Sequence, residues 1–198
     1  RVLSASDHDL FLRAFDAATR GDWVAARNLA SQGQNPIARR LLEWRYALDK
    51  NSGATFAEID AVIKDTEAKN NAAAWPLRGT LQARAEAQIT PDLPPATIAA
   101  WFSARSPNSS IGKIRLGEAL IATGETARGA SLIRSGWSEG SFEPDIELAI
   151  LQKDASVLTP ESDRARLDRL LWRGEITAAK GIFNQPVAKQ MKLYGDRT

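Results

Sequence analysis

The segment RLLWRGEITAAKGIF, residues 169–183, contains the pattern that decides the fold of this chain. A run of good helix formers stops at Gly174, an acidic residue follows, and a second helix-forming run begins with paired alanines. Two other segments share this arrangement, AATRGDWVAARNLA at 17–30 and LIATGETARGASLI at 120–133. Each segment is typical of a corner between two consecutive helices.

Each corner contains four residues that suit the packing of its two helices. The glycine tolerates the left-handed conformation that closes a last helical turn. The acidic residue after it can accept hydrogen bonds from the free N–H groups of the next helix. A small residue five positions after the glycine lets the helices approach, and an aliphatic residue eight positions after it fills their seam. In chain order these sets are Gly21, Asp22, Ala26 and Leu29; Gly124, Glu125, Gly129 and Leu132; and Gly174, Glu175, Ala179 and Ile182. The pattern predicts αα-hairpins.

The corners also predict the fold class. They are unequally spaced, which excludes a strict 34-residue repeat, and no run of residues alternates with the period of two that strands need. We therefore predict an all-α chain, an irregular right-handed α-superhelix (solenoid) of αα-hairpins similar to tetratricopeptide arrays. The proline-rich residues 91–95 are the expected linker. They divide one superhelical domain into a first helical arm, 1–90, and a second helical arm, 96–198.

Further local signals place helices in the first arm. Thr55 and Glu58 have the spacing of a capping box, and Pro36 suits the first turn of a helix. The helix that follows Pro36 has apolar residues at i, i+4, i+7 and i+11, which predict its buried face. These residues are Ile37, Leu41, Trp44 and Leu48.

Composition excludes several classes of protein. The chain has 198 residues, of which 43% are hydrophobic, so it can bury a core in one or two domains. No stretch approaches the ~20 apolar residues of a membrane span, so we predict that the chain does not cross a membrane. The 26 basic and 24 acidic residues nearly balance and the basic ones are scattered, so nucleic acid is not an expected partner. The chain has no cysteine, which excludes disulfides and thiolate metal sites.

No residue pattern indicates catalysis, a metal or a cofactor. His8 is the only histidine, and it lies in the first turn of an expected helix, where capping or solvation is its ordinary role. With one histidine and no cysteine, a zinc site would need mostly carboxylate ligands. The glycine-rich, phosphate-loop, GxSxG and HExxH motifs are missing. Glu58 and Glu118 fall on the polar faces of expected helices, where a solvated charge is expected. We predict no catalytic residue, no metal site and no cofactor.

The six tryptophans are an unusual feature of the composition. In helical hairpins a tryptophan usually fills the space between adjacent helices, and its N–H bonds to a carbonyl. We expect this role for most of them. Trp75 and Trp137 fall at the edges of expected helices, so they are the candidates to line a groove and stack on sugar rings.

Three segments of the second arm share the residue order of a known family. They are SPNSSIG at 106–112, RLGEALIATGETARGASLIRSGW at 115–137 and LTPESDRARLDRLLWRGEITAAKGIF at 158–183. This order resembles the helical superhelix of the soluble lytic transglycosylases, bacterial enzymes that cleave peptidoglycan. The first arm matches more loosely, through Gly21-Asp22-Trp23 and Asn35-Pro36.

The resemblance implies a periplasmic protein whose export signal has been removed. In this family a lysozyme-like catalytic module follows the superhelix. Its single glutamate, in a Glu-Ser pair, acts as acid and then base and leaves a 1,6-anhydromuramyl product. A Gly-Leu-Met-Gln segment follows that pair. No such segment follows Glu161-Ser162, so we assign no catalytic role to Glu161 and expect this chain alone to be inactive.

The function implied by the resemblance is that of a non-catalytic superhelical domain. Such a domain would position peptidoglycan glycan strands, partner proteins or the lysozyme-like catalytic module. Arg164, Arg166 and Asp168, on the polar side of an expected helix, are candidates for the surface that contacts the module, and a solvated charge is the alternative role for them. The alternative function is a free-standing tetratricopeptide-like adaptor that binds proteins in its concave face. A third function, helical nucleic-acid binding, would need a continuous basic stripe.

Overall fold

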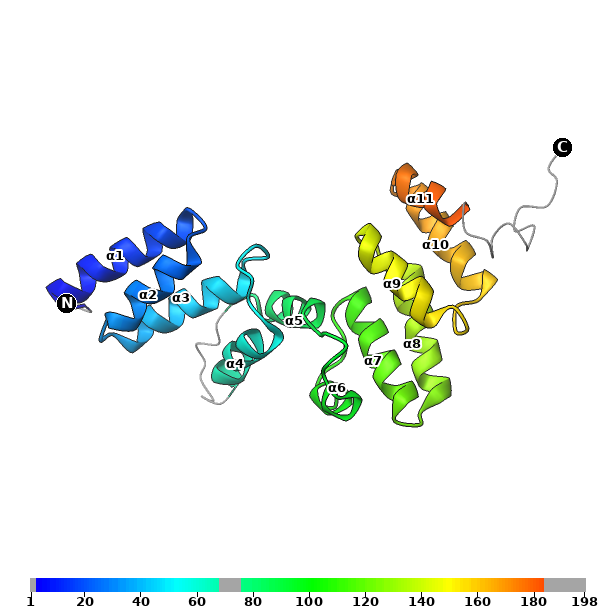
Figure 1. The fold of residues 1–198 in the computed structure, drawn as a ribbon, viewed down its shortest axis with the longest axis horizontal. Helices are drawn as coiled ribbons and strands as arrows, with labels where there is room; N and C mark the ends of the chain where they lie inside the picture. The colour runs from blue at the N-terminus through cyan, green and yellow to red at the C-terminus, as the bar shows by residue number, and fades with distance from the viewer. Residues whose placement is uncertain (1–2, 68–75, 184–198) are drawn as a thin grey trace. The chain divides into compact units, whose positions relative to one another are not determined.

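The computed structural model describes residues 3–67 and 76–183, and the described residues contain eleven α-helices and no strand (Figure 1). The prediction of an all-α chain is confirmed over this part of the sequence. The helices are α1 (Ala5–Thr19), α2 (Trp23–Gln32), α3 (Pro36–Leu48), α4 (Phe56–Glu67), α5 (Arg78–Ala87), α6 (Pro95–Trp101), α7 (Ser110–Ala122), α8 (Thr126–Glu139), α9 (Pro144–Asp154), α10 (Pro160–Trp172) and α11 (Ile176–Phe183).

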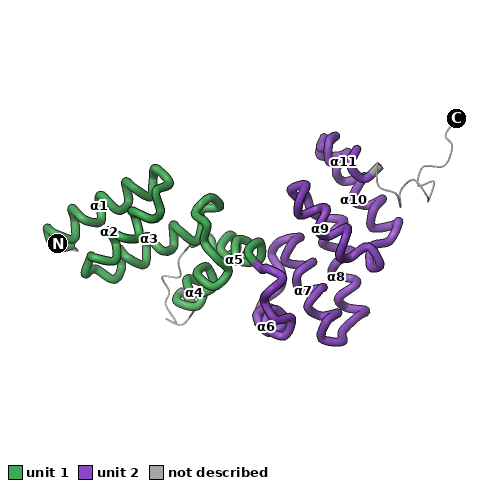
Figure 2. Tube along the Cα trace, in the orientation of Figure 1, with its two compact units in different colours: residues 1–88 green, residues 89–198 purple. Residues whose placement is uncertain are grey.

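The chain divides into two compact units, residues 1–88 and 89–198 (Figure 2). The boundary lies just before the predicted linker at 91–95. The last residue of that linker, Pro95, opens helix α6. Among the described residues, no helix has the length and apolar character needed to cross a bilayer.

Unit 1 is built from α1 to α5. Helix α1 packs on α2, α2 packs on α3, and α4 packs on α5, while α3 also contacts α1, α4 and α5. The core between these helices consists of fully buried apolar residues, among them Phe11, Ala14, Ala26, Leu42, Ile59, Leu81 and Ala85. Small residues are frequent in this core, which lets the helices lie close together.

Unit 2 is built from α6 to α11, and its closest helix pair is α7 and α8. Two glycines face each other in this pair. A Cβ atom at Gly129 would lie 2.5 Å from the carbonyl oxygen of Gly117, and one at Gly117 would lie 2.6 Å from that of Gly129. No side chain fits at such a distance, so the two glycines set the separation of the helices.

The glycine prediction at the three corners is confirmed. Gly21, Gly124 and Gly174 have φ angles of +79°, +100° and +71°, in the left-handed region. At each corner the N–H of the acidic residue donates to the carbonyl five positions earlier, at 3.0, 2.8 and 2.9 Å respectively. This bond is the one that defines a Schellman ending of a helix.

The prediction for the acidic side chains is confirmed at one corner only. Asp22 Oδ1 accepts a hydrogen bond from the N–H of Ala25 at 3.0 Å. Glu125 makes no capping bond and instead pairs with Arg128 at 3.0 Å. Glu175 accepts from the Ser141 hydroxyl at 2.7 Å. Glutamate has one more methylene than aspartate, and at these two corners its carboxylate reaches a side chain rather than the helix N–H groups.

Other local predictions have mixed outcomes. The capping box is confirmed, because Glu58 Oε2 accepts from the Thr55 N–H at 2.9 Å and Thr55 Oγ1 accepts from the Glu58 N–H at 3.3 Å. The apolar stripe predicted on α3 is wrong, since Ile37 is 60% exposed. The buried residues of α3 are Ala38, Leu42, Tyr46 and Ala47. Helix α3 contacts α1, α2, α4 and α5, and the positions of these neighbours, rather than the apolar period alone, select the buried face.

Candidate functional site

Trp137 lies in the core of unit 2, which corrects the placement predicted for it at a groove edge. Its side chain is fully buried and packs with Ile114 and Ile150. Its indole Nε1 donates to Asp163 Oδ1 at 2.8 Å, and its ring stacks on Phe142 with the ring centres 6.1 Å apart. No face of this indole is open to a sugar ring. The other tryptophan candidate, Trp75, lies outside the described residues.

Arg166 is also buried, which corrects its predicted position on the polar side of α10. Its guanidinium donates to the carbonyls of Trp137 and Gly140 and to Glu147 Oε2, the last at 2.7 Å. The guanidinium carbon lies 4.2 Å from the centre of the Trp137 ring. Burial lowers the pKa of Arg166, and the neighbouring Glu147 carboxylate opposes this. The arginine therefore satisfies carbonyls at the end of α8, which would otherwise lack donors.

The remaining candidates on α10 are exposed, and they share a face with a tryptophan. Arg164, Asp168 and Trp172 follow one another at i+4 steps, so they lie along one side of the helix. Trp172 is 91% exposed and Leu171 beside it is 46% exposed. The core position expected for this tryptophan is therefore wrong. We call Arg164, Asp168, Leu171 and Trp172 the α10 face.

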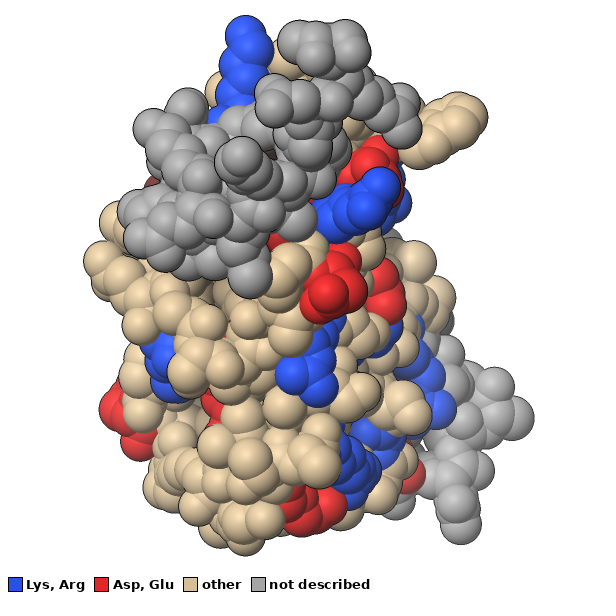
Figure 3. Space-filling model, turned by 90° about the vertical axis from the view of Figure 1, so that its right-hand side faces the viewer, with Lys and Arg blue, Asp and Glu red and all other residues tan. Residues whose placement is uncertain are grey.

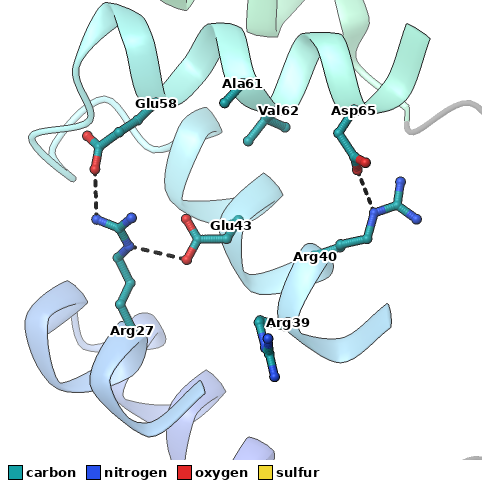
Figure 4. A pocket seen from close by; sticks show the side chains of 8 residues that line it. All are labelled: Arg27, Arg39, Arg40, Glu43, Glu58, Ala61, Val62 and Asp65. Atoms are coloured by element: carbon teal, nitrogen blue, oxygen red, sulfur yellow. Dashed lines mark hydrogen bonds and ion pairs between the residues drawn. The ribbon is translucent and has the colours of Figure 1, made fainter. Parts of the chain in front are cut away.

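Unit 1 has a groove that the sequence did not indicate. One hollow of about 290 Å³ lies between α2, α3 and α4 (Figure 4), and a second of about 460 Å³ shares Arg27 and Glu43 with it. We call the two together the unit-1 groove. The residues that line the first hollow are Arg27, Arg39, Arg40, Glu43, Glu58, Ala61, Val62 and Asp65. The second adds Trp23, Val24, Asn28, Ser31, Tyr46 and Ser52.

Arg27 bridges the groove where its two hollows meet. Its Nε lies 3.2 Å from Glu43 Oε1 and its Nη1 lies 2.8 Å from Glu58 Oε1 (Figure 4). The Tyr46 ring lies beneath the guanidinium, 4.3 Å from ring centre to guanidinium carbon. This arrangement holds Arg27 in one position, because two carboxylates and a ring contact it at once.

Glu58 is an anion at neutral pH. Burial acts to raise the pKa of Glu58, but the Thr55 backbone N–H and the Arg27 guanidinium outweigh it and hold that pKa below its ordinary value. A general acid would need the opposite shift. Glu58 is therefore suited to bind a cation and not to donate a proton.

At the other end of the first hollow, Arg40 Nε lies 2.5 Å from Asp65 Oδ2. Arg39 also lines the hollow, where it is exposed and donates to the Gly33 carbonyl, and within the described part of the chain no carboxylate lies in ion-pair range of it. The lining thus contains three arginines and three carboxylates.

Unit 2 has a larger hollow of about 770 Å³ at the start of α7 and along α8. Arg105, Lys113 and Arg128 line it, with serines and without any acidic residue. Lys113 lies 2.5 Å from Glu139 and Arg128 lies 3.0 Å from Glu125. These carboxylates neutralise Lys113 and Arg128, so the hollow attracts an anion less strongly than its lining suggests.

A buried carboxyl pair lies in unit 2, where a solvated charge is predicted for Glu118. The Glu118 side chain is 10% exposed and pairs with Arg115 at 2.9 Å and with Lys153 at 2.7 Å. Asp154 is 4% exposed and hydrogen-bonds to Glu118. Burial, and then the negative charge of Glu118, raise the pKa of Asp154 to about 7. Neither carboxyl lines any of these three hollows.

The charges on the surface are mixed. Figure 3 shows blue and red side chains interspersed over one face, without a continuous basic stripe among its described residues. His8 is exposed on α1. Among the described residues no group of three or more His, Cys, Asp and Glu side chains is placed to hold a metal.

Comparisons of the chain with protein-family models, curated proteins and solved structures found no match.

Proposed function

We propose that this chain is a non-catalytic helical domain of a periplasmic peptidoglycan lytic transglycosylase. It positions glycan strands or partner proteins beside a lysozyme-like catalytic module. The proposal starts from the resemblance of residues 106–183 to the superhelix of that family. It is supported by the fact that these residues form hairpins with left-handed glycines at both of their corners, Gly124 and Gly174.

The electrostatics of the unit-1 groove support binding rather than cleavage. The pKa of Glu58 is lowered, so this glutamate is an anion and lacks the proton that glycoside cleavage requires. Asp154 and Asp163 are carboxyls whose pKa burial raises, and neither lines any of the three hollows. In the described part of the chain, none of the three hollows is therefore lined by a carboxyl whose raised pKa would suit it to donate a proton.

The α10 face is the proposed contact with the catalytic module or with glycan. Trp172 offers a nearly complete indole surface to a partner, and tryptophan is enriched where partners bind tightly. Arg164 and Asp168 on the same side supply charges of both signs. Arg166 does not belong to this surface. Its guanidinium is buried in unit 2, where it donates to the Trp137 carbonyl and to Glu147.

Purified sacculi provide the test of the proposal. The chain should co-sediment with sacculi or bind the separately expressed catalytic module, and mass spectrometry of the soluble fraction should find no 1,6-anhydromuropeptides. Release of anhydro products by the chain alone would disprove the non-catalytic role. Loss of both binding activities would disprove the scaffold role.

A matched pair of variants tests the α10 face. Trp172→Ala removes an exposed apolar side chain from α10, and Leu12→Ala removes one that is 61% exposed from α1 and lines none of the hollows. The first should weaken binding to the module or sacculi about tenfold or more, and the second should leave it unchanged. Equal binding by both variants would remove the α10 face from the proposal.

The alternative function is a free-standing helical adaptor for another protein. The unit-1 groove favours it, because a groove between consecutive hairpins is where helical-repeat proteins bind extended peptides. The precursor gene separates the two functions. A cleaved export signal and a lysozyme-like segment in the same reading frame support the transglycosylase scaffold, and a gene without either supports the adaptor.

A further inference from the structure

We infer that the C-terminal half of α9, residues 149–154, is held on α7 by a proton that Asp154 shares with Glu118, and that it undocks from α7 when this proton is lost. The rest of unit 2 stays folded during this opening. The inference goes beyond the binding function proposed above and does not rest on it, because it is argued from contacts within unit 2 alone.

Helix α9 buries few of its side chains. Its buried residues are Ile150 and Asp154. Ile150 packs with Ile114 and Trp137, and two half-buried residues of α9 lie beside them. One of the two side chains that α9 buries completely is therefore a carboxyl group, and an ionised carboxyl is costly to bury.

The contact between Asp154 and Glu118 requires a proton. The two carboxyls are hydrogen-bonded, and a carboxyl can donate a hydrogen bond only in its protonated form. No hydrogen-bond donor in the described part of the chain reaches the buried Oδ2 atom of Asp154. Loss of the proton would therefore leave two neighbouring carboxylates in the interior, one of them with an oxygen that lacks a donor.

The nearby cations are bound to Glu118 and not to Asp154. Arg115 Nη1 lies 2.9 Å from Glu118 Oε1, and Lys153 Nζ lies 2.7 Å from Glu118 Oε2. Both cations favour an ionised Asp154, but burial and the charge of Glu118 outweigh them and raise the pKa of Asp154 to about 7. The proton is therefore lost close to neutral pH.

The position of Asp154 directs the effect of ionisation to one end of α9. It is the last residue of the helix, where the helix dipole is negative, so a carboxylate is repelled there and a neutral carboxyl is not. The first half of α9 is held by a different contact, the ion pair of Glu147 with Arg166 of α10 at 2.7 Å. From α8, Arg134 donates to the Val157 carbonyl, beyond the end of α9. The opening should therefore begin at Asp154 and leave the first turn of α9 on α10.

Native-state hydrogen exchange of the full chain, followed residue by residue in NMR spectra from pH 5 to pH 8, tests the inference. A helical segment this short does not persist once it is undocked, so the N–H groups of residues 149–154 should exchange through a local opening. After correction for the intrinsic exchange rate, the opening constant should rise about tenfold per pH unit between pH 5 and pH 7 and level off above pH 7. Low concentrations of urea should hardly change it, since a local opening exposes little surface.

Three variants and an internal reference make the test specific. The amides of α8 around the fully buried Ile133 are the reference, because their exchange requires the core of unit 2 to open and urea should accelerate it strongly. Asp154→Asn should remove the pH dependence in α9, because asparagine does not ionise. Glu118→Gln should make the rise level off at a lower pH, because its amide can donate to an ionised Asp154. Asp145→Asn, an exposed change in the first turn of α9, should leave the dependence unchanged.

The outcomes are distinct. Exchange of residues 149–154 that rises with pH, resists urea and loses its pH dependence in Asp154→Asn supports the inference. If these amides have the opening constant and the urea dependence of those in α8, α9 leaves α7 only when unit 2 unfolds, and the inference is overturned. A pH dependence that Asp154→Asn leaves unchanged would also overturn it, since another group would then control the opening. None of these results depends on binding to sacculi, so the proposed function is tested separately.

Discussion

An Asp154→Asn substitution should reduce the dependence of folding stability on pH between pH 5 and pH 8. Asp154 is 4% exposed and its pKa is about 7, against an ordinary value of 3.8. The charged groups that face it are Glu118, Arg115 and Lys153. Because the folded chain holds the proton more tightly than the unfolded chain, the free energy of unfolding falls as pH rises from about 4 to about 7.

The magnitude follows from the two pKa values. Each tenfold difference in proton affinity corresponds to about 1.4 kcal/mol, so the whole effect is about 4 kcal/mol. Between pH 5 and pH 8 the unmodified chain should lose about 2 to 3 kcal/mol relative to the variant. Asparagine stays neutral at every pH and can still donate to Glu118, so the variant should be the more stable chain at pH 8.

Urea unfolding of the full chain at several pH values, followed by circular dichroism, measures this difference. Hydrogen exchange in α7 and α9 should report the same trend locally, since these helices carry Glu118 and Asp154. Asp145→Asn, an exposed change in the first turn of α9, is the matched control and should not alter the slope with pH. If Asp154→Asn and the unmodified chain lose stability in parallel as the pH rises, Asp154 does not bind its proton more tightly in the folded chain than in the unfolded chain.

Four further substitutions test the packing. Gly129→Ala should cost about 1 to 3 kcal/mol in urea unfolding, because its new Cβ meets a backbone carbonyl of α7, whereas Gly181→Ala, which has only a contact at 3.8 Å, should cost nothing. Glu147→Ala should lower stability by about 3 kcal/mol by leaving the Arg166 charge buried without its carboxylate, and a thermal melt should show a clear drop. Trp172→Ala should change the melting temperature little, since the indole is 91% exposed.

Each of these results can also contradict the reasoning. Equal stabilities of the two glycine variants would mean that the separation of α7 and α8 adjusts freely. A Glu147→Ala chain as stable as the original would mean that solvent reaches Arg166. A large loss of stability in Trp172→Ala would mean that the indole packs against part of the chain.

The helix corners could be predicted because their signals are local. A glycine with positive φ, the Schellman bond beside it and the capping box of Thr55 and Glu58 all involve residues within five positions of one another. Their energies depend on backbone conformation and hardly on what packs nearby. The all-α class followed from these signals together with the missing strand period.

Burial of particular side chains could not be predicted in the same way. Trp137 and Trp172 both stand near the C-terminal end of a helix, yet one is fully buried and the other is almost fully exposed. Trp172 follows the buried Leu170 by two residues, which turns it about 200° to the opposite side of α10. Which side of a helix faces the core depends on its neighbours, and sequence spacing alone does not state which neighbours are present.

The groove depended entirely on tertiary structure. Arg27 meets Glu43 and Glu58 from 16 and 31 positions away in the chain, and each of these three residues belongs to a different helix. On its own helix each has the pattern of an ordinary surface charge. Only the packing of α2, α3 and α4 brings them to one hollow with Arg39 and Asp65.

The sequence by itself determined that the chain is helical, where its hairpins turn and which glycines close them, because backbone conformation and hydrogen bonding within one turn decide these features. Tertiary structure alone decided that Arg166 and Trp137 form a core, that Trp172 is exposed, and that charges far apart in the sequence line one groove. The physical reason is range: caps and turns act over a few residues, whereas burial and the pairing of charges depend on distances in space between helices far apart in sequence.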